Sequence, residues 1–108
     1  MRKVPLKFQE FNKENPRIAE AYENLAAECN KSGPLSERER SLVKLGIAIG
    51  SGMEGGIRSQ VRKGLDNGLR PDEIRHAFLL ALTAIGFPRM MAALISAEDI
   101  LREENLSR

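Results

Sequence analysis

A cluster of glycines between two apolar runs is the feature that most constrains this chain. The first run spans residues 42–49, and the second places apolar residues at helical spacing from Ile57 to Leu65. Glycine tolerates positive φ and close backbone approach, so a cluster of glycines permits a tight corner. We therefore expect two helices joined by such a corner and closed by Asn67-Gly68, a C-terminal signal. The glycines of the corner are Gly50, Gly52, Gly55 and Gly56.

Start and stop signals divide the rest of the chain into helices. Ser36 followed by Glu39 matches a capping box, and proline stands at first-turn positions in Asn15-Pro16 and at Pro71. Ser32-Gly33-Pro34 and Gly86-Phe87-Pro88 interrupt helical periodicity. No segment alternates convincingly as a strand would. The sequence therefore predicts an all-α helical bundle of about five helices, forming one domain over residues 1–108.

The first twelve residues differ from this pattern. They have no clear helical period, and Pro5 disfavours a helix there. We expect residues 1–12 to form an N-terminal arm, either tethered to the body of the protein or reaching a neighbouring subunit.

Composition excludes several classes of protein. The net charge is only +2 over 108 residues, and basic and acidic residues alternate along the chain, so no nucleic-acid-binding face is expected. No apolar run approaches the roughly 20 residues that span a membrane. The N-terminus lacks the apolar core of a secretory signal. We expect a cytoplasmic protein that binds neither nucleic acid nor membrane.

The one cysteine, Cys29, excludes an internal disulfide and an all-cysteine metal site. It shares an apolar helical stripe with Ile18, Tyr22 and Leu25. We expect it to be buried and inert, the alternative being a reactive thiol.

Two features predict close helix contacts. Gly46 lies within an apolar helix, where its use would be the close approach of another helix. The helix that begins at Pro71 is apolar nearly all round, because Leu79 and Leu80 lie outside its core stripe. Since a monomer of this size cannot bury that whole perimeter, we expect a subunit interface and a homo-oligomer.

The order of these motifs resembles the carboxymuconolactone decarboxylase and alkylhydroperoxidase (AhpD-like) family. The resemblance covers about Leu35 to Ile100 and includes L-S-x-R-E-R at 35–40, the glycine corner and G-F-P at 86–88. It implies an all-α fold that assembles as a homotrimer, or as a hexamer built from trimers.

The catalytic places of the family's peroxidase branch are changed in this chain. The two cysteine places hold Met53 and Gly56, the histidine place holds Gln60, and the glutamate place holds Ser41. Methionine and glycine supply neither a thiolate nor a resolving thiol. The sequence therefore predicts a protein that is not a thiol peroxidase.

The family's decarboxylase branch resembles a proton-transfer enzyme with a histidine at the place of Gln60. Glutamine cannot titrate, although it can orient a carboxylate or a carbonyl. We therefore expect His76 and Glu54 to carry any catalysis and Gln60, Arg58 and Met53 to contact substrate, with no cofactor and no metal.

Alternative interpretations apply to the same residues. His76 can be a boundary histidine, satisfied by a backbone carbonyl or a neighbouring subunit, or it can face the corner. Glu54 and Arg58 can form a solvated i, i+4 pair, or Arg58 can hold an anionic ligand.

Two hypotheses of function follow. The first is a non-redox, oligomeric small-molecule binder or degenerate family member, whose partners are its own copies and a small acidic or lactone ligand. The alternative is a cofactor-free decarboxylase or lactone-type proton-transfer enzyme that uses His76 and Glu54.

Overall fold

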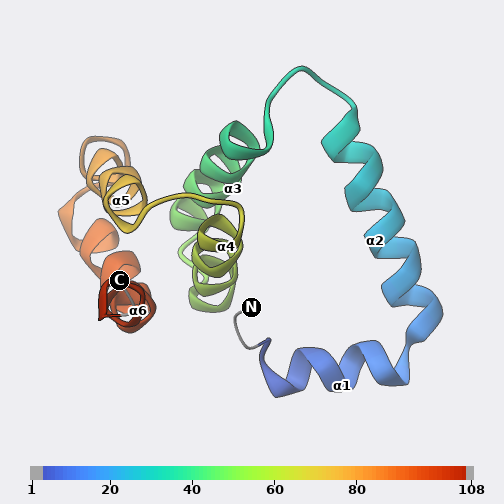
Figure 1. The fold of residues 1–108 in the computed structure, drawn as a ribbon. Coiled ribbons are helices and arrows are strands. Elements are labelled where there is room, and N and C mark those ends of the chain that lie inside the picture. Colours follow the sequence, from blue (N-terminus) through green and yellow to red (C-terminus); the bar gives the residue numbers. More distant parts are fainter. Residues whose placement is uncertain (1–3, 107–108) are drawn as a thin grey trace. The chain divides into compact units, whose positions relative to one another are not determined.

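The computed structural model describes residues 4–106, with side chains as far as Glu104. Over this range the chain forms six helices and no strand (Figure 1). The all-α prediction is confirmed. The helices are α1 (Leu6–Glu14), α2 (Pro16–Lys31), α3 (Glu37–Ser51), α4 (Glu54–Asp66), α5 (Pro71–Ile85) and α6 (Phe87–Leu106).

The chain divides after Leu35 into two compact units. The first contains α1 and α2, and the second contains α3 to α6. The single domain over residues 1–108 stays a prediction.

Helix α1 is the main difference from the predicted elements, because residues 6–12 are helical rather than part of an irregular arm. Pro5 takes the N-cap position with φ of −55°, and its carbonyl accepts the backbone N–H of Phe8 and of Gln9, each at 3.1 Å. A proline that precedes a helix costs it no internal hydrogen bond. Pro5 therefore begins a helix, and the number of helices rises from about five to six. Residues 1–3 of the predicted arm lie outside the described residues.

Helix α2 begins at Pro16 and ends before Ser32, as predicted. Its apolar stripe, however, is not buried: Tyr22 is 65% exposed, and Cys29 is also exposed. The prediction of a buried Cys29 is wrong. The physical reason is that two helices cannot enclose a core between them, and no described residue of α1 or α2 is buried.

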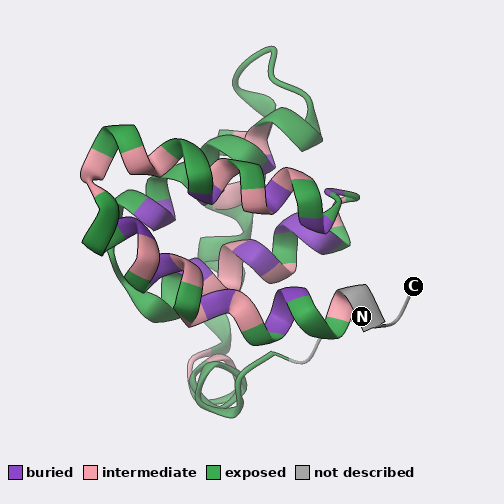
Figure 2. Ribbon diagram, turned by 90° about the vertical axis from the view of Figure 1, so that its left-hand side faces the viewer, coloured by how far each residue is buried: buried purple, intermediate pink, exposed green. Residues whose placement is uncertain are grey.

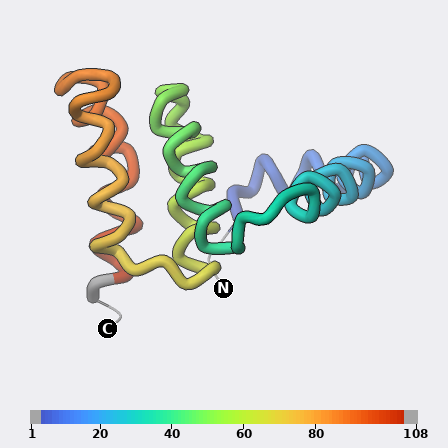
Figure 3. Tube along the Cα trace, turned by 90° about the horizontal axis from the view of Figure 1, so that it is seen from above, coloured from blue at the N-terminus to red at the C-terminus, as the bar shows by residue number. Residues whose placement is uncertain are grey.

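The second unit is a four-helix bundle around one core. Each helix packs mainly on two others, in the cyclic order α3, α4, α6, α5 (Figure 3), and α4 also contacts α5 across the bundle. Buried segments line the interior of the bundle, and exposed segments face outward (Figure 2). No helix over the described residues is long and apolar enough to cross a membrane. The largest fully buried side chains are Phe78, Leu45, Ile49, Ile57, Leu69, Ile74, Leu101 and Val61.

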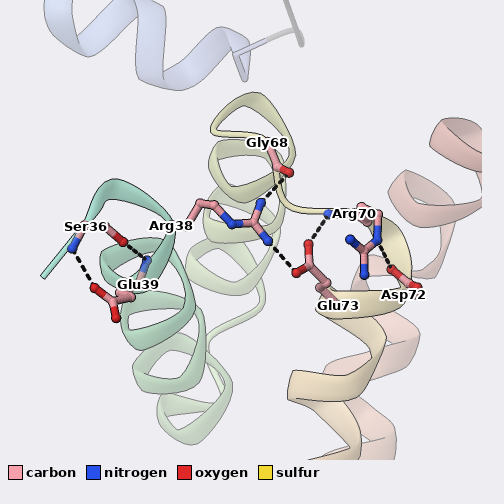
Figure 4. Close-up of polar contacts among 7 residues, drawn as sticks. All are labelled: Ser36, Arg38, Glu39, Gly68, Arg70, Asp72 and Glu73. Atoms are coloured by element: carbon pink, nitrogen blue, oxygen red, sulfur yellow. Dashed lines mark hydrogen bonds and ion pairs between the residues drawn. The ribbon is translucent and has the colours of Figure 1, made fainter.

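Local capping sets the ends of these helices. Ser36 Oγ accepts the backbone N–H of Glu39 at 3.2 Å, and the Ser36 N–H donates to Glu39 Oε1 at 2.8 Å (Figure 4). This reciprocal pair confirms the predicted capping box. The predicted corner is also present, because α3 closes on Gly52 at φ of +71° and α4 begins at Glu54. Positive φ again requires glycine at Gly68, after α4.

Candidate functional site

An apolar groove of about 460 Å³ runs between α3 and α5. Only two of its lining residues, Glu73 and His76, carry polar side chains. A cavity that is mostly apolar with few polar groups is the usual form of a small-molecule site. The remaining lining residues are Leu42, Gly46, Ile49, Gly50, Ala77, Leu80, Ala81, Ala84 and Ile85.

Small side chains keep this groove open. Gly46 and Gly50 stand four residues apart on α3, so they lie on the same helix face. A Cβ added at either position would meet no heavy atom within 4 Å. The expectation that Gly46 serves the close approach of another helix is therefore wrong for the described chain. Its missing side chain instead leaves one wall of the groove bare.

The polar end of the groove holds an ion pair between Arg38 and Glu73, called the latch below. Arg38, near the start of α3, donates to the Gly68 carbonyl at 2.8 Å and pairs with Glu73 Oε2 (Figure 4). The Arg70 N–H donates to Glu73 Oε1 at 2.8 Å, while the Arg70 side chain pairs with Asp72. The Arg70 N–H first, and then Arg38, lowers the pKa of Glu73. Glu73 therefore stays ionised near neutral pH, with both oxygens already accepting hydrogen bonds.

His76 lies one turn after Glu73 on the same face of α5 and lines the groove. Its side chain is exposed, and no hydrogen bond to it is found among the described residues. It is thus the uncommitted polar side chain of the groove. Because α3 and α5 start at the same end (Figure 3), His76 lies toward the start of α3, whereas the glycine corner follows its end. The structure therefore does not bring His76 to the corner.

The other four predicted site residues belong to α4 or its N-cap, and none of them lines the groove. Met53 is the N-cap residue and is 69% exposed. Glu54 is exposed in the first turn, and Gln60 is half-buried further along. The structure therefore separates His76 from the residues that the sequence grouped with it. A catalytic role for His76 and Glu54 stays a prediction.

Arg58, the fourth of these residues, fastens α4 to α6. Its guanidinium donates to Asp99 Oδ1 at 2.7 Å, to Asp99 Oδ2 at 3.0 Å and to the Ser96 carbonyl at 2.7 Å. The solvated pair with Glu54, one of the two alternatives for Arg58, is not formed, because a carboxylate that binds the guanidinium with both oxygens satisfies an arginine better than a solvated neighbour one turn away. This contact raises the pKa of Arg58 and lowers the pKa of Asp99. Arg58 is thus engaged in holding helices together.

Two of the changed family positions also have structural surroundings. Ser41 is buried, and its Oγ accepts a hydrogen bond from the Asn67 side-chain amide at 2.9 Å. This bond joins α3 to the end of α4. Gly56, in the first turn of α4, has only Met53 Cβ within 4.0 Å of an added Cβ.

The sequence reasoning did not identify the groove itself. Its signal was present as small residues at helical spacing: Gly46 and Gly50 on one helix, Ala77 and Ala81 on another. What could not be read was that these two faces meet each other. The role of Glu73 was also missed, because a glutamate three residues after a helix start is fully explained as a cap.

A model of the carboxymuconolactone decarboxylase family matches residues 16–99. The chain belongs to this family. The match begins at α2, includes the glycine corner and ends within α6. It confirms the resemblance noted in the sequence. No curated protein and no solved structure matches the chain. Within the described residues, no group of three or more His, Cys, Asp or Glu side chains is placed to hold a metal ion.

Proposed function

We propose that this protein is a non-redox member of the carboxymuconolactone decarboxylase family that binds a small molecule in the groove between α3 and α5. One observation carries the proposal: an apolar cavity of about 460 Å³ presents a single uncommitted polar side chain, that of His76. Apolar walls bind the body of a ligand, and a polar group fixes its orientation. A small acid or a lactone, which the family suggests, offers oxygen atoms for the imidazole.

The chemistry of the corner supports the non-redox part of the proposal. Thiol catalysis needs a thiolate and a second thiol to resolve the mixed disulfide. The corner carries Met53 and Gly56, and the one cysteine of the chain lies on α2, in the other unit.

The groove can be closed by a single substitution. Gly46→Leu adds a side chain into the open space between α3 and α5, at a position with room for its Cβ. Gly55→Leu is the matched control, because Gly55 also has open space around an added Cβ but lies on α4, outside the groove. NMR titration with γ-octalactone and octanoate should show binding by the natural chain and by Gly55→Leu. Gly46→Leu should bind at least about tenfold more weakly, a loss of about 1.4 kcal/mol.

Two results would contradict this proposal. Gly46→Leu could bind as the natural chain does, or neither compound could shift the methyl resonances of Ala81 and Ala84. A third pattern, in which Gly46→Leu changes only the molar mass in solution, would identify the groove as an interface between copies instead.

The alternative, a cofactor-free proton-transfer enzyme, is favoured by one specific arrangement. The carboxylate of Glu73 precedes the imidazole of His76 by one turn on the groove wall, so an acidic and a basic side chain line the same groove. Glu54, the acid predicted for this role, does not line the groove. His76→Gln keeps a hydrogen-bonding group but removes the titrating one. For an enzyme, this variant should still bind a lactone and lose its turnover; equal turnover would exclude the alternative.

We also propose that the protein is a homotrimer or a hexamer. The support is the apolar outer surface of the second unit, where Leu79, Phe87 and Ile95 are each more than half exposed. Soluble monomers rarely expose many large apolar side chains together. Light scattering should give three or six times the 12.0 kDa chain mass, and Leu79→Glu should lower it. A monomer in the natural chain would refute the proposal.

A further inference from the structure

The groove has an elongated shape with a polar end. Along α3 its wall extends from Leu42 to Gly50, a separation of eight residues or about 12 Å at the rise of an α-helix. Glu73 and His76 lie toward the start of α5, whereas Ala84 and Ile85 line the other end. A ligand that follows the whole length of this groove is therefore an elongated molecule with its polar group at one end.

The polar end of the groove presents a carboxylate, whose ion-pair partner lies outside the lining. Glu73 is held ionised by the Arg70 N–H and by Arg38. The compensating guanidinium of Arg38 binds Glu73 and the Gly68 carbonyl but is not part of the groove lining. The groove surface therefore presents one fixed carboxylate beside the place where the ligand's polar group would lie.

A second carboxylate at this position would face Glu73. Two like charges a few ångströms apart repel each other, and part of this repulsion persists in a half-open site. An uncharged hydroxyl or carbonyl meets no such penalty and still exchanges a hydrogen bond with His76.

We infer that Glu73 is a specificity-determining residue, through which the groove favours an elongated ligand whose polar group is an uncharged hydroxyl or carbonyl over the matching carboxylate. This inference rests on the proposed function, because it concerns the same groove. It narrows the ligand class from acids and lactones to neutral oxygen compounds.

The test compares octanol with octanoate, which share a chain of the same length, by NMR titration of the natural protein at pH 8. Octanol should bind about tenfold more tightly. Glu73→Gln should raise the affinity for octanoate about tenfold and leave that for octanol within about twofold. Arg38→Gln removes the compensating charge and should weaken octanoate further, again with little effect on octanol. Asp72→Asn is the control, because Asp72 pairs with Arg70 outside the groove, and it should change neither affinity.

The outcomes separate the two proposals. Equal affinities for the two compounds in the natural protein would overturn the inference while leaving the ligand groove intact. Parallel changes in both affinities on Glu73→Gln would also overturn it, because a structural role of the latch would affect both ligands alike. If neither compound binds, the proposed function itself fails. Should Glu73→Gln not fold, the natural protein and Arg38→Gln still decide the question.

Discussion

Two helix–helix interfaces of the four-helix bundle, called seams here, differ at their outer edges. Side chains cover the α4/α6 seam, whereas the α3/α5 seam is left open as a groove. Across α4/α6, Arg58 reaches over to Asp99 and to the Ser96 carbonyl. Across α3/α5, the Arg38–Glu73 ion pair spans only the end at which both helices start, and beyond it the small residues of the lining leave a groove. The comparison teaches that the residues at the rim of a seam, rather than the core beneath it, decide whether the bundle has a ligand groove.

Two further arginines lie near α6. Arg62 follows Arg58 by one turn on α4 and is half-buried; burial first, and then the charge of Arg58, lowers its pKa. A long arginine stem covers apolar surface while its charged end remains near water. Between α5 and α6, Arg75 pairs with Glu98 at 2.9 Å. Helix α6 is thus fastened to both of its neighbours by ion pairs.

The largest expected effect is on the free energy of unfolding, and it distinguishes a core residue of α5 from a groove residue of the same helix. Phe78 is 1% exposed and Leu80 is 60% exposed. Phe78→Ala should lower the free energy of unfolding by about 3–5 kcal/mol, because it leaves a cavity in the core that both seams share. Leu80→Ala should change it by less than about 0.5 kcal/mol, as is typical of surface positions. Urea unfolding measures both; a similar cost for the two would show that Leu80 is covered in solution.

Opening the closed seam should have a smaller effect. Arg58→Met keeps a long apolar side chain but removes three hydrogen bonds. We expect a loss of about 1–2 kcal/mol in the free energy of unfolding, because the pair is only partly buried. A double-mutant cycle with Asp99→Asn isolates the pairwise contribution. A coupling energy of zero would mean that the seam is closed by packing alone.

Glycine-to-alanine substitutions compare an open wall with a filled one. Gly46→Ala adds a methyl group to the groove and should stabilise the protein by about 0.5–1 kcal/mol through helix propensity. At Gly64 on α4 the added Cβ would lie 3.0 Å from Leu69 Cδ1 and 3.7 Å from Ile74 Cδ1. Crowding at the buried Gly64 should cancel much of the same gain. Thermal unfolding of both variants checks the difference; a gain at Gly46 as small as that at Gly64 would argue that the groove is filled in solution.

The smallest expected effect is the pH dependence of the free energy of unfolding. Arg58 lowers the pKa of Asp99, so as pH falls the unfolded chain binds this proton before the folded chain does. The stabilisation is present above the ordinary aspartate pKa of about 3.9 and is lost as pH falls through the lowered folded value. The stability advantage of the natural chain over Asp99→Asn, at most about 1 kcal/mol near pH 7, should therefore shrink as the pH falls below about 3.9. Urea unfolding at a series of pH values measures this, and a difference independent of pH would contradict it.

Local signals in the sequence predicted most of the helices. The Ser36 capping box, the prolines at the starts of α2 and α5, and the glycine after α3 each act within one turn of backbone. Their effect does not depend on the rest of the fold, so it can be predicted from the sequence without a structure. Pro5 was misread because a proline both interrupts and begins helices, and its neighbours decide which.

Interactions between residues far apart in the sequence could not be predicted in this way. A partner for Arg58 was expected one turn away at Glu54, but the structure places Asp99 across the seam instead, forty-one residues along the chain. The exposure of Cys29 likewise depends on what packs against α2 rather than on its position in an apolar stripe.

The sequence by itself determined that this chain is all-α, where most of its helices begin and end, and that it has the motif order of its family without corner thiols. Only the tertiary structure decided that the small-residue faces of α3 and α5 meet as an open groove, with Glu73 and His76 at one end. The physical reason is the separation along the chain between the residues that interact. Caps and turns are fixed by backbone neighbours, whereas a groove exists only where two helices, set apart in the chain, are packed together by a core.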